Sequence, residues 1–162
     1  MTYYEDLSPY EYFADSEPLG LQPVNVGWLD ENKPFPKGET SLEFKAKLFE
    51  FCLDKYVVQI ARGFHTCQFC GVSEHEWYEQ SKERYGEEAH WLSIYEEKAQ
   101  PMSLGNGEIR VIGQSTLYAA PTLIHHYVVE HNYKPPDEFI EAVFEGPAPG
   151  SKEHETLLKK YR

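Results

Sequence analysis

Cysteine and basic residues are both scarce in this sequence. Its 162 residues include only three cysteines, too few for the disulfide framework of a small secreted domain. Fifteen lysines and arginines face 27 aspartates and glutamates, which gives a net charge of -12. A surface this acidic repels phosphate backbones, so we expect no nucleic-acid partner. The charge serves solubility alone, or it favours a basic protein or a cation as the partner.

Long hydrophobic runs are missing as well. No stretch approaches the roughly 20 apolar residues that a membrane helix needs. Residues 1–20 have neither the basic start nor the apolar run of a secretory signal. The sequence therefore predicts a cytoplasmic protein that does not enter a membrane.

Several short catalytic motifs are also absent. The chain contains no P-loop, no GxGxxG, no GxSxG, no HExxH and no zinc-deaminase signature. These absences remove the most recognisable nucleotide-dependent, hydrolytic and metalloprotease classes. They favour a protein that acts by binding, and we treat an enzymatic role as the less favoured alternative.

The composition is nevertheless that of a folded domain. Hydrophobic residues make up 41% of the chain and aromatic residues 15%, which is enough for a core without disulfides. The length fits one domain. We expect this domain to span residues 1–146, with a charged insertion at residues 72–100. A linker and a polar C-terminal tail are expected at residues 147–162.

Hydrophobic patterning predicts an α+β fold, in which a small antiparallel sheet carries packed helices and a zinc knuckle. Alternating or β-branched stretches predict strands at residues 24–29, 56–61, 107–113 and 115–120. Helical spacing and N-terminal capping or proline signals predict helices at residues 41–53, 121–131 and 136–144. Cys52 falls on the apolar side of the first helix, where it is expected to be a buried core thiol.

The most informative motif pairs two cysteines with two downstream histidines. Cys67 and Cys70 are separated by two residues, between a predicted strand and Gly71, a spacing typical of zinc knuckles. His126 and His131 are separated by four residues, within the range of paired zinc histidines. Two thiolates and two imidazoles would form a closed, four-coordinate site. We therefore predict a structural Zn²⁺ ion bound by these four residues.

Two features complicate this prediction. Cys70 and His126 are separated by 55 residues, so the predicted hairpin must return the chain to the knuckle. On an ideal helix, positions 126 and 131 point about 140° apart, so both can bind only if the helix loosens near its end. His65 and His125 are rival ligands, and the cysteines can also be simple reduced thiols.

Two other kinds of chemistry compete with a structural zinc ion. A redox CxxC motif needs a helix beginning at the cysteines, and no helical pattern begins there. A zinc-dependent hydrolase needs an open metal position and a nearby general base, for which Glu130 and Glu108 are the candidates. Glu130 is more readily explained as a solvated helix residue.

The chain resembles a family of small uncharacterised bacterial proteins. The similarity rests on YYEDLSPY at residues 3–10, NVGWLD at 25–30, RGFH at 62–65 with Cys67 and Cys70, and GEIRV at 107–111. It continues through YAAP at 118–121, HYV at 126–128, His131 and the two prolines at 135 and 136. The resemblance implies kinship without an assigned activity, and residues 72–100 look like a variable insertion.

Together these observations predict a small acidic zinc protein of bacterial type. The favoured function is non-enzymatic interaction with a protein partner, as in an immunity or accessory protein. The alternative is a zinc-dependent, hydrolase-like enzyme with an open metal site.

Overall fold

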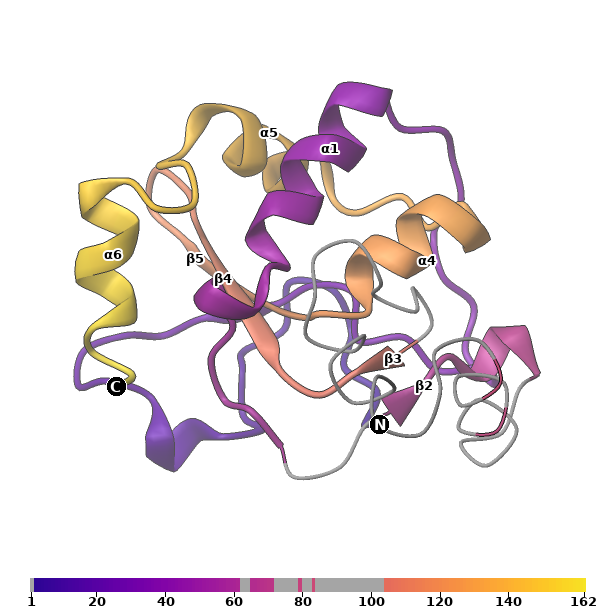
Figure 1. The fold of residues 1–162 in the computed structure, drawn as a ribbon, viewed down its shortest axis with the longest axis horizontal. Helices are drawn as coiled ribbons and strands as arrows, with labels where there is room; N and C mark the ends of the chain where they lie inside the picture. Colours follow the sequence, from indigo (N-terminus) through magenta and orange to yellow (C-terminus); the bar gives the residue numbers. More distant parts are fainter. Residues whose placement is uncertain (1, 62–64, 72–78, 80–82, 84–103) are drawn as a thin grey trace.

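The computed structural model of the chain describes residues 2–61, 65–71, 79, 83 and 104–162 (Figure 1). The predicted insertion at residues 72–100 lies outside the described residues except for positions 79 and 83. The first three residues of the RGFH motif, at positions 62–64, lie outside them too. The helices, strands and contacts that follow are those of the described residues.

The described strands form two small sheets. In the larger sheet, β5 (Leu117–Pro121) lies between β1 (Val24–Asn25) and β4 (Glu108–Ile112). Strand β5 pairs antiparallel with β4 and parallel with β1. The α+β class is thus confirmed, but the sheet is mixed and not purely antiparallel as expected. A second, antiparallel pair joins β2 (His65–Thr66) to β3 (Leu104–Gly105).

The described part of the chain contains four α-helices with defined bounds. They are α1 (Leu42–Phe51), α4 (Ile124–His131), α5 (Asp137–Glu145) and α6 (Lys152–Leu158). The described chain also contains three short 3-10 helices, η1 (Ala14–Ser16), η2 (Asp54–Tyr56) and η3 (Gln68–Cys70). Side chains of Ser41 and Ser151 cap α1 and α6, each by accepting a hydrogen bond from a backbone N–H three residues on. None of these helices combines the length and apolar composition of a membrane span.

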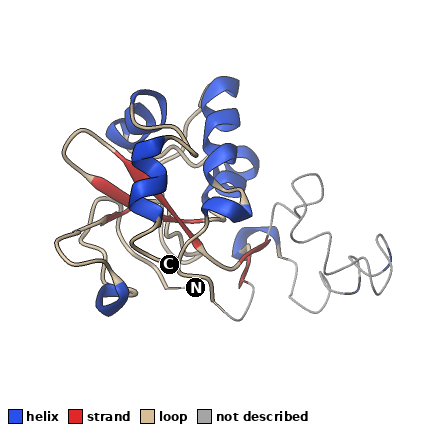
Figure 2. Cartoon of the chain, turned by 60° about the vertical axis from the view of Figure 1, so that its left-hand side comes forward, coloured by secondary structure: helices blue, strands red, loops and turns tan. Residues whose placement is uncertain are grey.

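One side of the sheet carries the main hydrophobic core. Helix α1 contributes Phe44, Leu48 and Phe51, which are almost fully buried and recur at helical spacing. Alternate residues of β4, Ile109 and Val111, join the same cluster. Figure 2 shows the helices crowded beside the β4–β5 hairpin. This packing fixes α4, which carries two of the predicted ligands.

The opposite side of the sheet is covered by the N-terminal segment. Here Tyr10, Trp28 and Ala119 form a second buried cluster, against which Tyr4, Tyr12 and Phe13 pack. The charged residues of β4, Glu108 and Arg110, alternate with its core residues and are also buried. A strand with the sequence EIRVI is thus covered on both faces.

Gly27 explains how closely the N-terminal segment approaches α4. Its φ of +76° lies in the left-handed region, and an added Cβ would lie 2.8 Å from Cγ1 of Ile124, the first residue of α4. Its backbone N–H donates to Oδ1 of Asp6 at 2.9 Å. A side chain at this position would push the start of α4 away from the sheet.

Two predicted elements differ in the structure. The strand expected at residues 56–61 is reduced to a single bridge between Val58 and Glu108, and Gln59 next to it has a positive φ of 50°, which is outside the range of a strand. The helix expected from Pro121 begins at Ile124, since Pro121 is still the last residue of β5. The domain boundary at residue 147 stays a prediction. Beyond it, α6 buries His154, Leu157 and Leu158.

The buried guanidinium of Arg110 gives a test of this packing. We expect Arg110→Leu to lower the free energy of unfolding by about 3–5 kcal/mol, because it leaves the Glu108 and Glu17 carboxylates buried without their cation. Urea denaturation measures the change. Lys134→Met is the control, since its ion pair with Asp137 is exposed and contributes less than about 1 kcal/mol. Equal losses in the two variants would contradict the described packing.

Candidate metal centre

A tight turn after β2 presents the two cysteines. Cys67 ends the extended segment, η3 follows at once, and the Cys70 N–H faces the Cys67 carbonyl oxygen at 3.4 Å. Gly71 then leaves the turn with a left-handed φ of 67°, a conformation that glycine adopts without strain. Cys67 is buried with 1% of its surface exposed, whereas Cys70 is exposed. One thiol therefore faces the core and the other lies at the rim.

The end of α4 supplies both imidazoles. The helix stops at His131, and Asn132 follows in the left-handed conformation with a φ of 52°. The Asn132 N–H donates to the Tyr127 carbonyl five residues back, so the last turn is wider than α-helical. This is the loosened end that the spacing of His126 and His131 required. Their Nε2 atoms lie 3.1 Å apart.

Four potential ligand atoms converge between these two segments. The Nε2 atom of His131 lies 3.3 Å from Sγ of Cys67 and 3.4 Å from Sγ of Cys70. Nε2 of His126 lies 3.3 Å from Sγ of Cys70. All four atoms lie within 4.8 Å of one another, so this cluster can hold a metal ion.

These separations are close to those of a tetrahedral site. Zinc bonds of about 2.3 Å to sulfur and 2.0–2.1 Å to nitrogen imply S···N edges of about 3.5 Å and an N···N edge of about 3.3 Å. Three of the four S···N distances, at 3.3–3.4 Å, and the N···N distance of 3.1 Å are slightly shorter. Small outward shifts of the side chains would accommodate an ion at the centre.

Burial determines the protonation of the donors. It lowers the pKa of His126 to about 4, with the neighbouring His131 adding to the effect, and it also lowers the pKa of His131. Both imidazoles are therefore neutral near pH 7, which is the form that binds a metal. Burial and the nearby Cys70 raise the pKa of Cys67 to about 12, so an incoming cation must displace its proton.

The surroundings of the cluster are aromatic. The ring of Phe69, between the two cysteines, packs 5.3 Å from that of His131 and 5.7 Å from that of Tyr127. The spacing of the cysteines and histidines did not predict that aromatic rings surround the cluster. The sequence feature that could have predicted it is the phenylalanine at position 69, inside the CxxC motif.

Nδ1 of His126 is buried without a hydrogen-bond partner in the described part of the chain. Metal-bound histidines usually have such a partner, so this one orients by packing alone.

The rival residues lie elsewhere. His65 belongs to β2 and lines a separate pocket, and His125 is buried against the ring of Phe49 at 5.1 Å. Among the described residues, the metal-type cluster contains only the two cysteines and the two histidines that the sequence favoured. Glu130 is exposed and Glu108 pairs with Arg110, so neither candidate base belongs to the cluster. Cys52 is buried in the core, as expected.

Comparison with known proteins places the chain in a family without giving it an activity. A family model described as a domain of unknown function, DUF7919, matches residues 2–144. No curated protein and no solved structure matches the chain. The match agrees with the expected kinship to an uncharacterised family, whereas the proposed family motifs and the bacterial source stay predictions. Because this family model matches most of the chain, the chain belongs to the DUF7919 family.

Proposed function

We propose that Cys67, Cys70, His126 and His131 bind one zinc ion and that the ion is structural. We further propose that the protein acts by binding a basic protein partner, as an immunity or accessory protein of bacterial type does. The observation that carries the first part is the convergence of two thiols and two imidazoles, whose ligand atoms all lie within 4.8 Å of one another. The net charge of -12 supports the second part.

Zinc is the metal that best suits this donor set. Two thiolates and two imidazoles at tetrahedral positions are typical of zinc, and oxygen-seeking cations such as magnesium and calcium would find no carboxylate in the cluster. Iron–sulfur clusters usually take four thiolates, and this part of the chain offers two. A reducing compartment such as the cytoplasm would keep both thiols available for the metal.

The geometry favours a structural ion over a catalytic one. A hydrolytic zinc ion keeps a coordination position open for water and has an acid or base beside it. Here four donors would complete the tetrahedron, and the two glutamates considered as bases lie outside the cluster. The ion would tie the turn at residues 67–70 to the end of α4, two segments far apart in the sequence.

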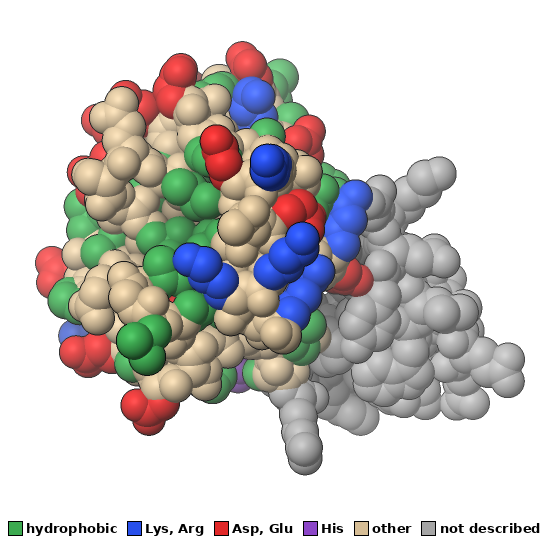
Figure 3. Space-filling view, turned by 90° about the vertical axis from the view of Figure 1, so that its left-hand side faces the viewer, with side chains coloured by type: hydrophobic (Ala, Val, Ile, Leu, Met, Phe, Trp, Pro, Cys, Tyr) green, Lys and Arg blue, Asp and Glu red, His purple; other side chains and the backbone are tan. Residues whose placement is uncertain are grey.

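The distribution of charge bears on the partner. Residues 72–103 contain eight acidic and three basic residues, so this stretch carries a large part of the acidic excess. Figure 3 shows the face at the left of Figure 1, where lysine and arginine side chains gather among acidic and hydrophobic ones. A basic partner would therefore avoid that face. We propose that the acidic stretch contributes to partner binding.

The zinc proposal predicts the metal content of the purified protein. We expect one zinc ion per chain, and none in Cys67→Ser or His126→Ala, because each change removes a ligand. Without the ion the turn loses its tie to α4, and the unfolding temperature should fall by at least about 5 °C. Elemental analysis and calorimetry measure the two effects.

The third cysteine provides the matched control for this experiment. Cys52→Ser also replaces a buried thiol, but it lies outside the cluster, so it should destabilise the core while retaining one zinc ion per chain. Wild-type protein without bound metal would refute the proposal. Loss of zinc from Cys52→Ser as well would mean that the metal content follows general stability and not these ligands.

The partner proposal predicts salt-sensitive binding. In affinity capture from the native host, we expect the protein to retain a specific basic protein that is released as the salt concentration rises, because screening weakens exposed charge pairs. A variant with the eight acidic residues of positions 72–103 changed to glutamine or asparagine should lose this protein. Equal capture by the variant, or no specific basic protein, would count against the proposal.

A further inference from the structure

A pocket lies beside the aromatic cluster of the N-terminal segment, and none of the four proposed metal ligands lines it. Among the described residues, its wall combines the aromatic residues Tyr12, Phe13 and Trp28 with residues at the ends of β3 and β5 and with the polar residues Gln59, His65, Asn106, Glu108 and Thr122. The cavity volume is about 20 Å³, which is room for a single group the size of a water molecule. Most of the pocket surface is apolar, and Glu108 is the only acidic residue among the described residues that line it.

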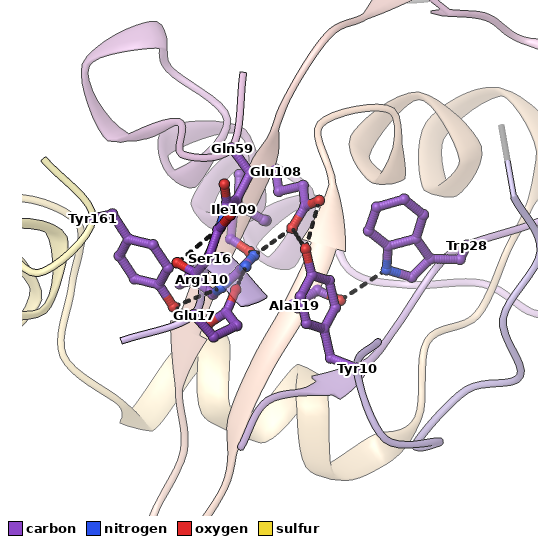
Figure 4. A network of polar contacts seen from close by, with 10 residues as sticks. All are labelled: Tyr10, Ser16, Glu17, Trp28, Gln59, Glu108, Ile109, Arg110, Ala119 and Tyr161. Carbon is purple, nitrogen blue, oxygen red and sulfur yellow. Dashed lines mark hydrogen bonds and ion pairs between the residues drawn. The ribbon is translucent and has the colours of Figure 1, made fainter. Parts of the chain in front are cut away.

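Glu108 belongs to a buried network of charged side chains, in which the described residues include two acids and one base (Figure 4). Arg110 forms ion pairs with Glu108, at 2.7 Å, and with Glu17. The side chains of Arg110, Glu108 and Glu17 are only 0%, 3% and 6% exposed. Among the described residues, two carboxylates therefore share one guanidinium out of contact with bulk water. Burial raises the pKa of Glu108, because it makes the charged form costly, and a further cation beside the carboxylate would offset that cost.

The described residues also leave acceptor positions of the Glu108 carboxylate unused. Its Oε2 accepts from Arg110 Nη1 at 2.7 Å, and the hydroxyl of Tyr10 lies 2.9 Å from Oε1 and 2.8 Å from Oε2. The phenol has a single proton and can donate to one of these oxygens at a time. An ionised carboxylate offers about four acceptor positions, and the described residues occupy roughly half of them.

The aromatic wall indicates which cation fits. The faces of tyrosine, phenylalanine and tryptophan rings attract organic ammonium groups, and burial strengthens the effect. Magnesium and calcium need six or more oxygen ligands around the ion, and a cavity with room for one water-sized group and a single acidic residue among its described residues is too small to gather them. A primary ammonium group has the size of water and carries three donors, which suits both the volume and Glu108.

We propose that this pocket binds the primary ammonium group of a small alkylamine, with the ammonium against Glu108 and the alkyl chain leading out past the rings of Tyr12 and Phe13. Its charge would complete the buried network of Glu108, Arg110 and Glu17. This inference is independent of the zinc ion, because none of the proposed metal ligands lines the pocket.

Calorimetric titration of the full chain with ethylammonium tests the proposal. We expect saturable 1:1 binding with a Kd on the order of 1 mM, near the limit for so few ligand atoms. Ethanol has the same number of heavy atoms without the charge, and it should not bind measurably. Tetraethylammonium should fail as well, because its head is too large for the cavity.

Substitutions then locate the binding. Glu108→Gln keeps the shape of the side chain and removes its charge, so we expect affinity to fall at least tenfold. Tyr12→Leu removes an aromatic face without touching the ion pairs, and it should weaken binding even if Glu108→Gln folds poorly. The control is Glu145→Gln, an exposed change that should leave the affinity unaltered. Absence of saturable binding to the wild type, equal binding of ethanol, or full affinity in folded Glu108→Gln would each overturn the proposal.

Discussion

The region around residues 65–71 depends on a cluster of two thiols and two imidazoles drawn together from distant parts of the chain. Strands β2 and β3 pair over two residues each, which is too short to hold a segment in place. Without an ion, the cluster would offer only weak S···N contacts in return for burying a thiol and an imidazole with an orphan Nδ1. A metal ion changes this balance, because its bonds to four donors offset the cost of dehydrating and ordering them. The ion would thus be the main tie between the cysteine turn and α4.

Strand β4 links this region to the rest of the molecule. Its core residues, Ile109 and Val111, pack beneath the helices, while Glu108 and Arg110 face the N-terminal segment. The C-terminal Tyr161 closes that side, since its hydroxyl donates to Glu17 at 2.7 Å and accepts from Arg110 Nε at 3.0 Å. The buried guanidinium of Arg110 therefore contacts both the N-terminal segment, through Glu17, and the C-terminal end, through Tyr161. The small pocket beside Glu108 shares the β2–β3 ribbon with the cysteine turn, so the two sites are neighbours with separate ligands.

The sequence predicted the metal cluster better than it predicted the sheet. Spacing alone selected Cys67, Cys70, His126 and His131, because zinc-binding residues obey short local rules, and the structure brings their donor atoms together. Excluding the rival His65 required the fold, since its distance from the cysteines depends on how the chain turns after β2 and on where a distant helix ends. The parallel pairing of β1 with β5 escaped prediction because it joins segments some 90 residues apart. The burial of Glu108 and Arg110 escaped too, since EIRVI has the pattern of a strand with one exposed face, and only the N-terminal segment and Tyr161 cover that face.

X-ray absorption spectroscopy at the zinc edge, on protein purified without added metal, tests the central claim most directly, because it reports both the element and its ligands. We expect a four-coordinate zinc ion with two sulfur neighbours at about 2.3 Å and two nitrogen neighbours at about 2.0–2.1 Å. A shell with one sulfur or none, or with a bound water in place of an imidazole, would contradict the closed structural site. Absence of a zinc signal from folded protein would contradict it altogether.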